Sequence, residues 1–402
     1  MKLVLVSLLA ACSFPTPSEQ YACRTSDDCA GDRVCTRGYC VLGSSVGTDG
    51  PKGDGSGLDC TMFPARHFDA CTIPDPTGPL ALTTAGTYTF DTASGSLLDP
   101  GGASSTPAGG TFTNGRVISV TSFRVAAGST LRVIGSAPLI IAAWTTLEVD
   151  GTIDASSLGA PTTRGAGANP TECSTHVATP GNANNEGGGG GGGGGGQGAG
   201  GRGGNGDPNA NGTGGAGGTG IPIPLLLGGC AGAKGGNGSS IAGDGGDGGG
   251  AVQLTAKTSI SITGKVTAGG AGGKQAGPSG DGGGGGGGGA GGMLGLEAPT
   301  VTVASGAVLA ANGGGGGEGG GNQGTAQAGT NALASAARAT GGAGGSGGDG
   351  GPGSGGATLV GGGGQPDGAG GGGAGGAAGF IAIKGAATTT GAILSPPAIT
   401  IP

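Results

Sequence analysis

Short runs of alternating apolar and polar residues begin near residue 86 and recur almost to the end of the chain. Examples are GTYTF (86–90), RVISV (116–120) and APLIIAAWTTLEVDGTIDAS (137–156). Alternation with a period of two is typical of β-strands that bury one face. The pattern predicts an all-β fold for this part of the chain.

The longest of these stretches is repeated, with copies that begin at residues 250, 292 and, in shorter form, 379. In each full copy, two aliphatic residues separated by one position are followed by a glycine and then another aliphatic residue. The aligned sets are Leu147, Val149 and Ile153, then Ile260, Ile262 and Val266, then Val301, Val303 and Val308. One copy cannot bury its own aliphatic side chains, whereas stacked copies can, because like residues form a continuous apolar column.

The repeats therefore predict a parallel β-solenoid. Its corners, where the backbone turns sharply or takes positive φ, are expected at Gly128, Gly151, Gly264, Gly306 and Gly391. A β-sandwich is the alternative, but its strands need a hairpin signal about every 8–12 residues. The long excursions between the repeats fit crossovers between parallel strands better.

The excursions are made largely of glycine. Of the 111 glycines, 86 lie between residues 187 and 379, and residues 187–196 are all glycine. They occur in blocks rather than at every third position, which excludes a collagen triple helix. Two interpretations stay open: flexible, protease-sensitive loops, or extended polyglycine II-type helices that lie side by side and pair their backbone N–H and C=O groups.

The N-terminus has the features of an export signal. A lysine at position 2 precedes an apolar run from Leu3 to Ala11, which is too short to span a bilayer as a mature helix. The sequence LAAC, ending at Cys12, resembles the lipobox of bacterial lipoproteins, in which a peptidase cuts before the cysteine and the thiol carries a diacylglycerol. The resemblance implies a lipid anchor on Cys12, and Ser13 in place of aspartate implies sorting to the outer membrane. A plain secretory signal is the alternative.

Eight further cysteines are expected to be oxidised in an exported chain. Four of them lie within eighteen residues, too few to bury a core, so two disulfides are expected among Cys23, Cys29, Cys35 and Cys40. A zinc site is the alternative there, but this stretch lacks both CxxC pairs and histidine. The spacing is similar to that of small Dickkopf-type modules that follow lipoboxes. Two more bridges are predicted, one closing a short loop and one bracketing the ten glycines: Cys60 with Cys71, and Cys173 with Cys230.

Few residues are candidates for catalysis. Glu148 and Asp150 are predicted to face outward on one strand, with Asp154 beyond the next corner. Paired carboxylates are what a glycoside hydrolase or a calcium-assisted polysaccharide lyase requires. The other repeats carry no carboxylate at the equivalent positions, so a solvated strand face is the simpler interpretation.

Other motifs add little chemistry. His67 and His176 are the only histidines, and neither stands in a catalytic or zinc-binding motif, so both are expected in loops. The aspartates of the glycine blocks lack the nine-residue register of calcium-binding repeats. Outward hydroxyl residues at 259–261 and 300–302 resemble the arrays of ice-binding solenoids, although strand propensity explains them more simply. The sequence predicts no metal and no cofactor.

The formal net charge is −7, and no lysine or arginine cluster reverses it, which argues against nucleic acid as a partner. With its lipobox, Cys-rich module, β-repeats and glycine excursions, the chain resembles glycine-rich solenoid lipoproteins on Gram-negative, myxobacterial-type surfaces. The resemblance implies lipid anchoring in the outer membrane and display on the cell surface. The leading hypothesis is a non-enzymatic structural or adhesive protein that contacts an extracellular glycan, matrix or surface protein. The alternative is a β-solenoid carbohydrate-active enzyme that uses Glu148 and Asp150.

The predicted organisation follows from these features. It comprises a signal peptide (1–11), a lipidated N-terminus with the Cys-rich module (12–42), a flexible linker (43–59), the first part of the solenoid (60–186), a glycine-rich region with interspersed rungs (187–379), and a terminal rung with a tail (380–402).

Overall fold

The computed structural model describes residues 33–36, 39–42, 60, 63–112, 115–159, 162–207, 211–222, 226–277 and 282–401. The chain divides into two compact units, residues 1–59 and 60–402. In the first unit, β1 (Arg33–Thr36) and β2 (Tyr39–Leu42) form an antiparallel pair in which Cys35 lies opposite Cys40. The other described elements belong to the second unit, which is nearly all β.

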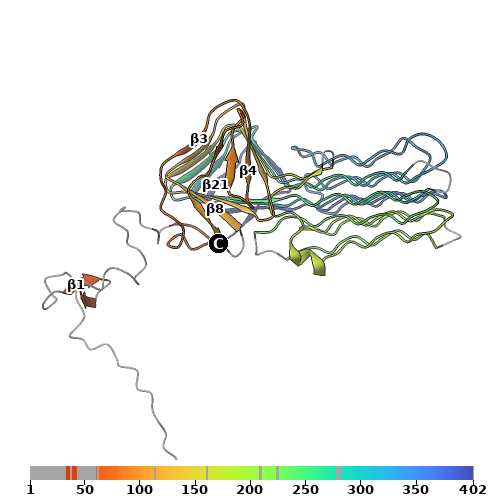
Figure 1. Cartoon of the computed structure of the whole chain (residues 1–402), viewed down its shortest axis with the longest axis horizontal. Helices are drawn as coiled ribbons and strands as arrows, with labels where there is room; N and C mark the ends of the chain where they lie inside the picture. Colours follow the sequence, from red (N-terminus) through yellow and green to blue (C-terminus); the bar gives the residue numbers. More distant parts are fainter. Residues whose placement is uncertain are drawn as a thin grey trace, which may run out of the picture. The chain divides into compact units, whose positions relative to one another are not determined.

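Three rows of parallel strands form the framework of the second unit (Figure 1). The first row contains β8 (Gly115–Val120), β11 (Leu139–Ala143), β16 (Ala251–Ala256), the start of β19 (Met293–Val303), the start of β21 (Phe380–Thr388) and β23 (Ile399–Thr400). The second contains β3 (Leu80–Leu82), β9 (Phe123–Val125), β12 (Thr146–Val149), β17 (Ser259–Ile262) and the ends of β19 and β21. The third contains β4 (Gly86–Asp91), β10 (Ser129–Ile134), β13 (Thr152–Asp154), β18 (Lys265–Thr267), β20 (Val308–Ala310) and β22 (Ile393–Ser395).

Like residues stack on neighbouring strands within each row, as the repeats predict. Leu147 pairs with Ile260, which pairs with Val301, and all three belong to one buried apolar cluster. One aligned position is wrong: Val266 lies opposite Leu309 and not opposite Val308. The corner before β20 contains two more residues than the corner before β18. The sequence alignment allowed for only one extra residue there, so it misplaced Val308 by one position.

The sheets are mixed rather than purely parallel, which differs from the expectation of a parallel fold throughout. β5 (Ser96–Leu98) and β6 (Ser104–Ser105) extend the third row from β4 by antiparallel pairing, and β7 (Gly109–Phe112) pairs antiparallel with β8. A separate antiparallel pair joins β14 (Leu158–Gly159) to β15 (Thr162–Thr163). These hairpins come before or beside the repeats, where the sequence lacks the repeated pattern.

Two kinds of glycine occupy the predicted corners. Gly128, Gly306 and Gly391 have positive φ, at 82°, 83° and 76°, which only glycine adopts without strain. Gly264 instead allows a close approach of the backbone, because a Cβ there would lie 1.9 Å from the carbonyl oxygen of Gly151.

The glycine-rich excursions form what we call the glycine bundle, the extended segments within residues 176–250, 268–292 and 311–379. In Figure 1 these segments run side by side, away from the strand rows and back again. The turns at the end remote from the strands are called the far-end loops; the fully described ones are residues 184–187, 237–241, 321–326, 343–347 and 365–369.

Backbone hydrogen bonds join the segments of the bundle with a period of three residues. In segment 187–197, every third N–H from residue 188 donates to segment 282–292, at 3.0, 2.9 and 2.9 Å. The N–H groups of residues 189 and 192 donate to segment 176–186, and every third N–H from residue 190 donates to segment 198–207. Segments pack too closely for side chains: a Cβ at Gly190 would lie 1.9 Å from the carbonyl oxygen of Gly372. The ten consecutive glycines are therefore ordered and hydrogen-bonded.

Candidate functional site

The predicted carboxylates Glu148 and Asp150 lie together at β12, opposite Arg124 of β9. The Arg124 guanidinium is 2.9 Å from Asp150 Oδ2 and 3.6 Å from Glu148 Oε2. The Thr263 hydroxyl donates to Asp150 Oδ1 at 2.8 Å. Hydrogen bonds from Arg124 and Thr263 lower the pKa of Asp150, so this carboxyl group is held in its ionised form.

Asp154, the third predicted carboxylate, belongs to a separate ion pair on the third row. Its Oδ2 atom accepts from the Arg132 guanidinium at 2.8 Å, and its Oδ1 atom accepts from the Thr267 hydroxyl at 2.7 Å. Each of the three carboxylates is therefore next to a cation. This arrangement ties neighbouring strands together.

The hydroxyl residues at 259–261 and 300–302 continue the outward face of the second row beyond Glu148. Ser261 lies opposite Glu148 on one side and Thr302 on the other, and Thr302 lies opposite Thr388. The result is a polar strip in which Thr302 and Thr388 are exposed.

A buried polar cluster on the outward face of the first row was not foreseen. Glu297 is 1% exposed, and its Oε2 atom accepts from the backbone N–H of Arg66 at 3.0 Å and from Nε2 of Gln253 at 2.9 Å. Oε1 of Gln253 also forms a hydrogen bond with the ring nitrogen Nδ1 of His67. The signal in the sequence was a lone carboxylate in the otherwise apolar run MLGLEA (293–298).

The cover over this cluster is the loop of residues 63–75. Its Cys71 forms a disulfide with Cys60, which closes the predicted short ring. Phe63 and Phe68 of this loop pack edge to face, and Phe63 packs against Trp144 with ring centroids 5.2 Å apart. Burial raises the pKa of Glu297, and this effect exceeds the opposing influence of the nearby charges of His67, Lys384 and Arg66. The cluster thus joins the covering loop to the sheet through the carboxyl group of Glu297, whose ionisation is disfavoured by burial.

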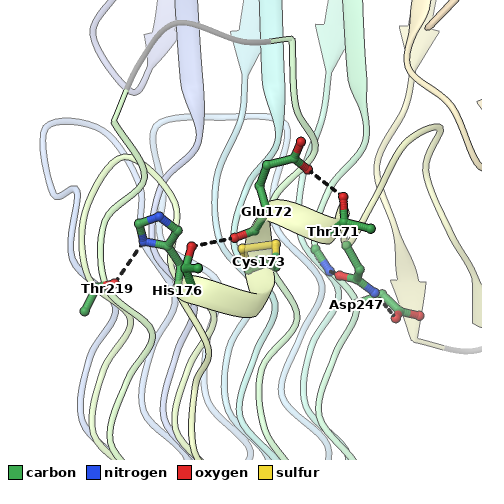
Figure 2. Close-up of a disulfide and its surroundings, with 10 residues drawn as sticks. Thr171, Glu172, Cys173, His176, Thr219 and Asp247 are labelled. Atoms are coloured by element: carbon green, nitrogen blue, oxygen red, sulfur yellow. Dashed lines mark hydrogen bonds between the residues drawn. A yellow bond between two sulfur atoms is a disulfide. The ribbon is translucent and has the colours of Figure 1, made fainter. Parts of the chain in front are cut away.

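The second predicted bridge, Cys173–Cys230, is also formed, with its cysteines 57 residues apart in sequence (Figure 2). Cys173 lies in a short 3-10 helix, Thr171–Thr175. Figure 2 shows His176 directed to the hydroxyl of Thr219, at 2.9 Å from Nδ1. The carboxylate of Asp247 accepts from the guanidinium of Arg164 and from the side-chain amide of Asn169.

Two open grooves lie beside these elements. One, of about 320 Å³, runs along the third row between Thr152, Asp154 and Lys265 and the loop that carries Leu333. The other, of about 340 Å³, lies between Pro138, Pro170 and Leu226 near the Cys173–Cys230 bridge. Neither groove contains Glu148 or Asp150.

Cys12, Cys23 and Cys29 lie outside the described residues. Within the described ranges, no group of three histidine, cysteine, aspartate or glutamate side chains is placed to hold a metal ion. Over the same residues, no helix has the length and apolarity needed to cross a membrane. Comparison of the chain with protein-family models, curated proteins and solved structures gives no match.

Proposed function

We propose that this protein is a non-enzymatic surface lipoprotein with a structural or adhesive role. The observation that carries the proposal is the glycine bundle, in which most of the chain between residues 176 and 379 forms hydrogen-bonded segments whose inward positions have no room for side chains. Such a body has few functional groups to catalyse a reaction. The bundle is suited to hold its far-end loops rigidly at a distance from the strands.

The rows of strands support this role if they act as a rigid base. We infer that they constitute a three-sided parallel β-solenoid, because each repeat supplies one strand to every row and the inward residues form a single apolar cluster. Stacked repeats of this kind resist bending, since each strand is paired along its length. Antiparallel hairpins would then complete the N-terminal end.

The segments of the bundle fit polyglycine II-type helices. The three-residue period of their hydrogen bonds matches three residues per turn, which directs successive N–H groups of one segment to three different neighbours. Backbone hydrogen bonding then replaces a hydrophobic core. This satisfies donors that isolated extended chains leave to water.

Anchoring is inferred from the sequence alone. The apolar run that ends at Cys12 supports export and lipidation, and acylation at more than one position would hold the chain firmly in the outer membrane. The −7 net charge is compatible with display on a cell surface, next to glycans or other surface proteins, and unfavourable for nucleic acid.

The alternative, a carbohydrate-active enzyme, receives less support. A general acid must carry a proton near neutral pH, whereas Arg124 and Thr263 favour the ionised form of Asp150. Among the described residues, the carboxyl group with a raised pKa is that of Glu297, which is covered by the loop of residues 63–75 and lies in neither of the two grooves described above.

The experiment compares Gram-negative cells that express the full chain, the Cys12→Ser variant and, as a matched control, Ser13→Ala. We expect the wild-type chain and Ser13→Ala to partition with membranes, to be removed by protease treatment of intact cells, and to increase cell retention on polysaccharide-coated surfaces. Cys12→Ser should release the chain and abolish the increase. Retention that is the same with and without the protein would contradict the adhesive role.

The same cells test the enzymatic alternative through the double variant Glu148→Gln/Asp150→Asn. We expect no release of reducing sugar by the wild-type chain and no change in adhesion for the double variant. Sugar release by the wild-type chain that disappears in the double variant would establish the enzyme instead.

A further inference from the structure

The far-end loops are joined to each other, so they form one surface. The backbone N–H of Asn184 donates to the carbonyl oxygen of Asn237 at 2.9 Å, which links loops 184–187 and 237–241. The N–H of Ser346 donates to the carbonyl oxygen of Gln323 at 2.8 Å, which links loops 343–347 and 321–326. Just below the loops, Gly371 donates to Gly188 at 2.9 Å and thereby connects the base of loop 365–369 to that of loop 184–187. The N–H of Gln365 donates to the carbonyl oxygen of Asp349 at 2.8 Å, which connects the same loop to the segment that follows loop 343–347.

A buried carboxylate fixes two of these loops. Glu318 is 0% exposed, and its Oε1 and Oε2 atoms accept from the backbone N–H groups of Gly345 and Gln327 at 2.5 and 2.9 Å. It stands in a segment that is otherwise glycine from residue 313 to residue 321. The loops are thus held in place before any partner binds, which lowers the entropy cost of binding.

Exposed side-chain amides gather on this surface. Asn185, Asn322, Gln323 and Gln365 are all exposed, and within the described part of the chain their side-chain amides form no hydrogen bond. Turn chemistry explains some asparagines nearby: Asn237 accepts from the N–H of Ala242 through its side chain at 3.1 Å. It does not explain the other four, since their amides stabilise no loop and glutamine is not a turn-forming residue.

The charge of the loops limits the kind of partner. Glu186 and Asp367 are acidic, and the five described far-end loops contain no lysine, arginine or histidine. An anionic ligand would therefore be repelled. The one large exposed apolar side chain in the five described loops is Ile241, at 73%, which is too little for an apolar protein interface.

We propose that the far-end loops bind a neutral, hydroxyl-rich polysaccharide. A side-chain amide offers both a donor and an acceptor, so it pairs with a sugar hydroxyl in either sense. Hydrogen bonds of this kind are individually weak, but a rigid surface presents several at once along an extended chain. The inference rests on the proposed adhesive role and names the surface and ligand class through which it acts.

The test uses the full-length chain in detergent and measures retardation in native gels that contain dextran, laminarin or mannan, with alginate as the anionic comparison. The far-end variant is Asn322→Ser/Gln323→Ser/Gln365→Ser. The matched control is Thr300→Ala/Thr302→Ala, which removes exposed hydroxyl groups from the polar strip of β19 instead. Both sets of side chains are exposed, so thermal unfolding of both variants should match the wild-type chain.

We expect the wild-type chain to bind at least one neutral polysaccharide and not alginate, the far-end variant to lose at least tenfold in affinity, and the strip variant to bind like the wild type. Wild-type affinity in the far-end variant, or loss confined to the strip variant, would overturn the far-end assignment while leaving the adhesive role intact. Binding of alginate alone would overturn the ligand class. No binding to any of these polysaccharides, with cell retention still dependent on the protein, would overturn this inference but not the proposed function. If the chain binds none of these polysaccharides and cell retention does not depend on the protein, both this inference and the proposed function are refuted.

Discussion

Substitution of Gly285 by alanine tests whether the bundle is held by close backbone packing. A Cβ on Gly285 would lie 2.0 Å from the carbonyl oxygen of Gly317, and relief to ordinary contact requires a movement of about 1.4 Å. The bond from the N–H of Gly317 to the carbonyl oxygen of Gly286 measures 2.8 Å, so this movement would stretch it beyond hydrogen-bonding range. The bonds one turn away, from Gly314 and Gly320, would be strained as well.

The expected loss follows from the number of bonds affected. One to three buried backbone hydrogen bonds, at roughly 1–3 kcal/mol each, give a decrease of about 1–9 kcal/mol in the free energy of unfolding. In the unit of residues 60–402, at roughly 2 cal/mol/K of unfolding entropy per residue, that corresponds to a fall of roughly 1–12 °C in Tm. Gly285→Val, which adds two more methyl groups, should lower Tm further.

The matched control is Gly363→Ala in the same bundle. Gly363 is exposed, and the nearest atom to its added Cβ is the Arg202 carbonyl oxygen at 3.4 Å, which is ordinary contact. Its Tm should stay within about 1 °C of the wild type or rise slightly, because alanine restricts the unfolded chain. Calorimetry measures both variants, and amide exchange reports on residues 282–289. Equal Tm values for the two alanine variants, with fast exchange across residues 282–289, would refute close packing.

Two further predictions concern the strand rows and the bridge to the bundle. Because burial raises the pKa of Glu297, the folded state favours the protonated form of this carboxyl group. The resulting stability is fully present below the ordinary carboxyl pKa and is lost as pH rises through the raised value. Glu297→Gln should therefore remove part of the decline in Tm between pH 4 and pH 8. Superimposable pH profiles of wild type and variant would show that the carboxyl group does not titrate in this range. Replacement of Cys173 and Cys230 by alanine should cost about 4 kcal/mol from the 57-residue loop, against about 3 kcal/mol for the 11-residue loop of Cys60 and Cys71, as measured by denaturant unfolding. A loss below about 1 kcal/mol for the first pair would mean that the bundle itself restrains that loop.

The strand rows could be predicted because their information is local. Period-two alternation identifies each strand, and the repeat identifies which strands pair, as the alignment of Leu147, Ile260 and Val301 shows. The register of Val308 was wrong because corner length is set by backbone geometry that the repeat does not encode. The antiparallel strands β5 to β7 have no counterpart in the repeats, so nothing in the pattern indicated them.

The buried cluster at Glu297 could not be predicted for a different reason. Its partners Arg66 and His67 are more than 200 residues away in sequence, in a loop without any periodic pattern. A carboxylate on the outward face of a strand is ordinarily in contact with solvent. Glu297 is buried because the loop of residues 63–75 covers it. Glu148 and Asp150 differ from Glu297 because their outward position follows from the alternation in the sequence. Their ion-pair partner Arg124 is placed beside them by the pairing of β9 with β12.

The glycine bundle separates stability from chemistry more completely than an ordinary core does. In an ordinary core, side chains both pack and tune the functional groups above them, so substitutions affect both. Here a Cβ at an interior position such as Gly190 meets a carbonyl oxygen, so packing depends on the absence of side chains. Chemical variation is then tolerated mainly in the far-end loops and on outer faces, where Gly363 and Gln365 are exposed. It follows that a substitution at Gln323 or Gln365 should alter binding without altering Tm, whereas one at Gly285 should alter Tm and reach the loops only by displacing the segments that hold them.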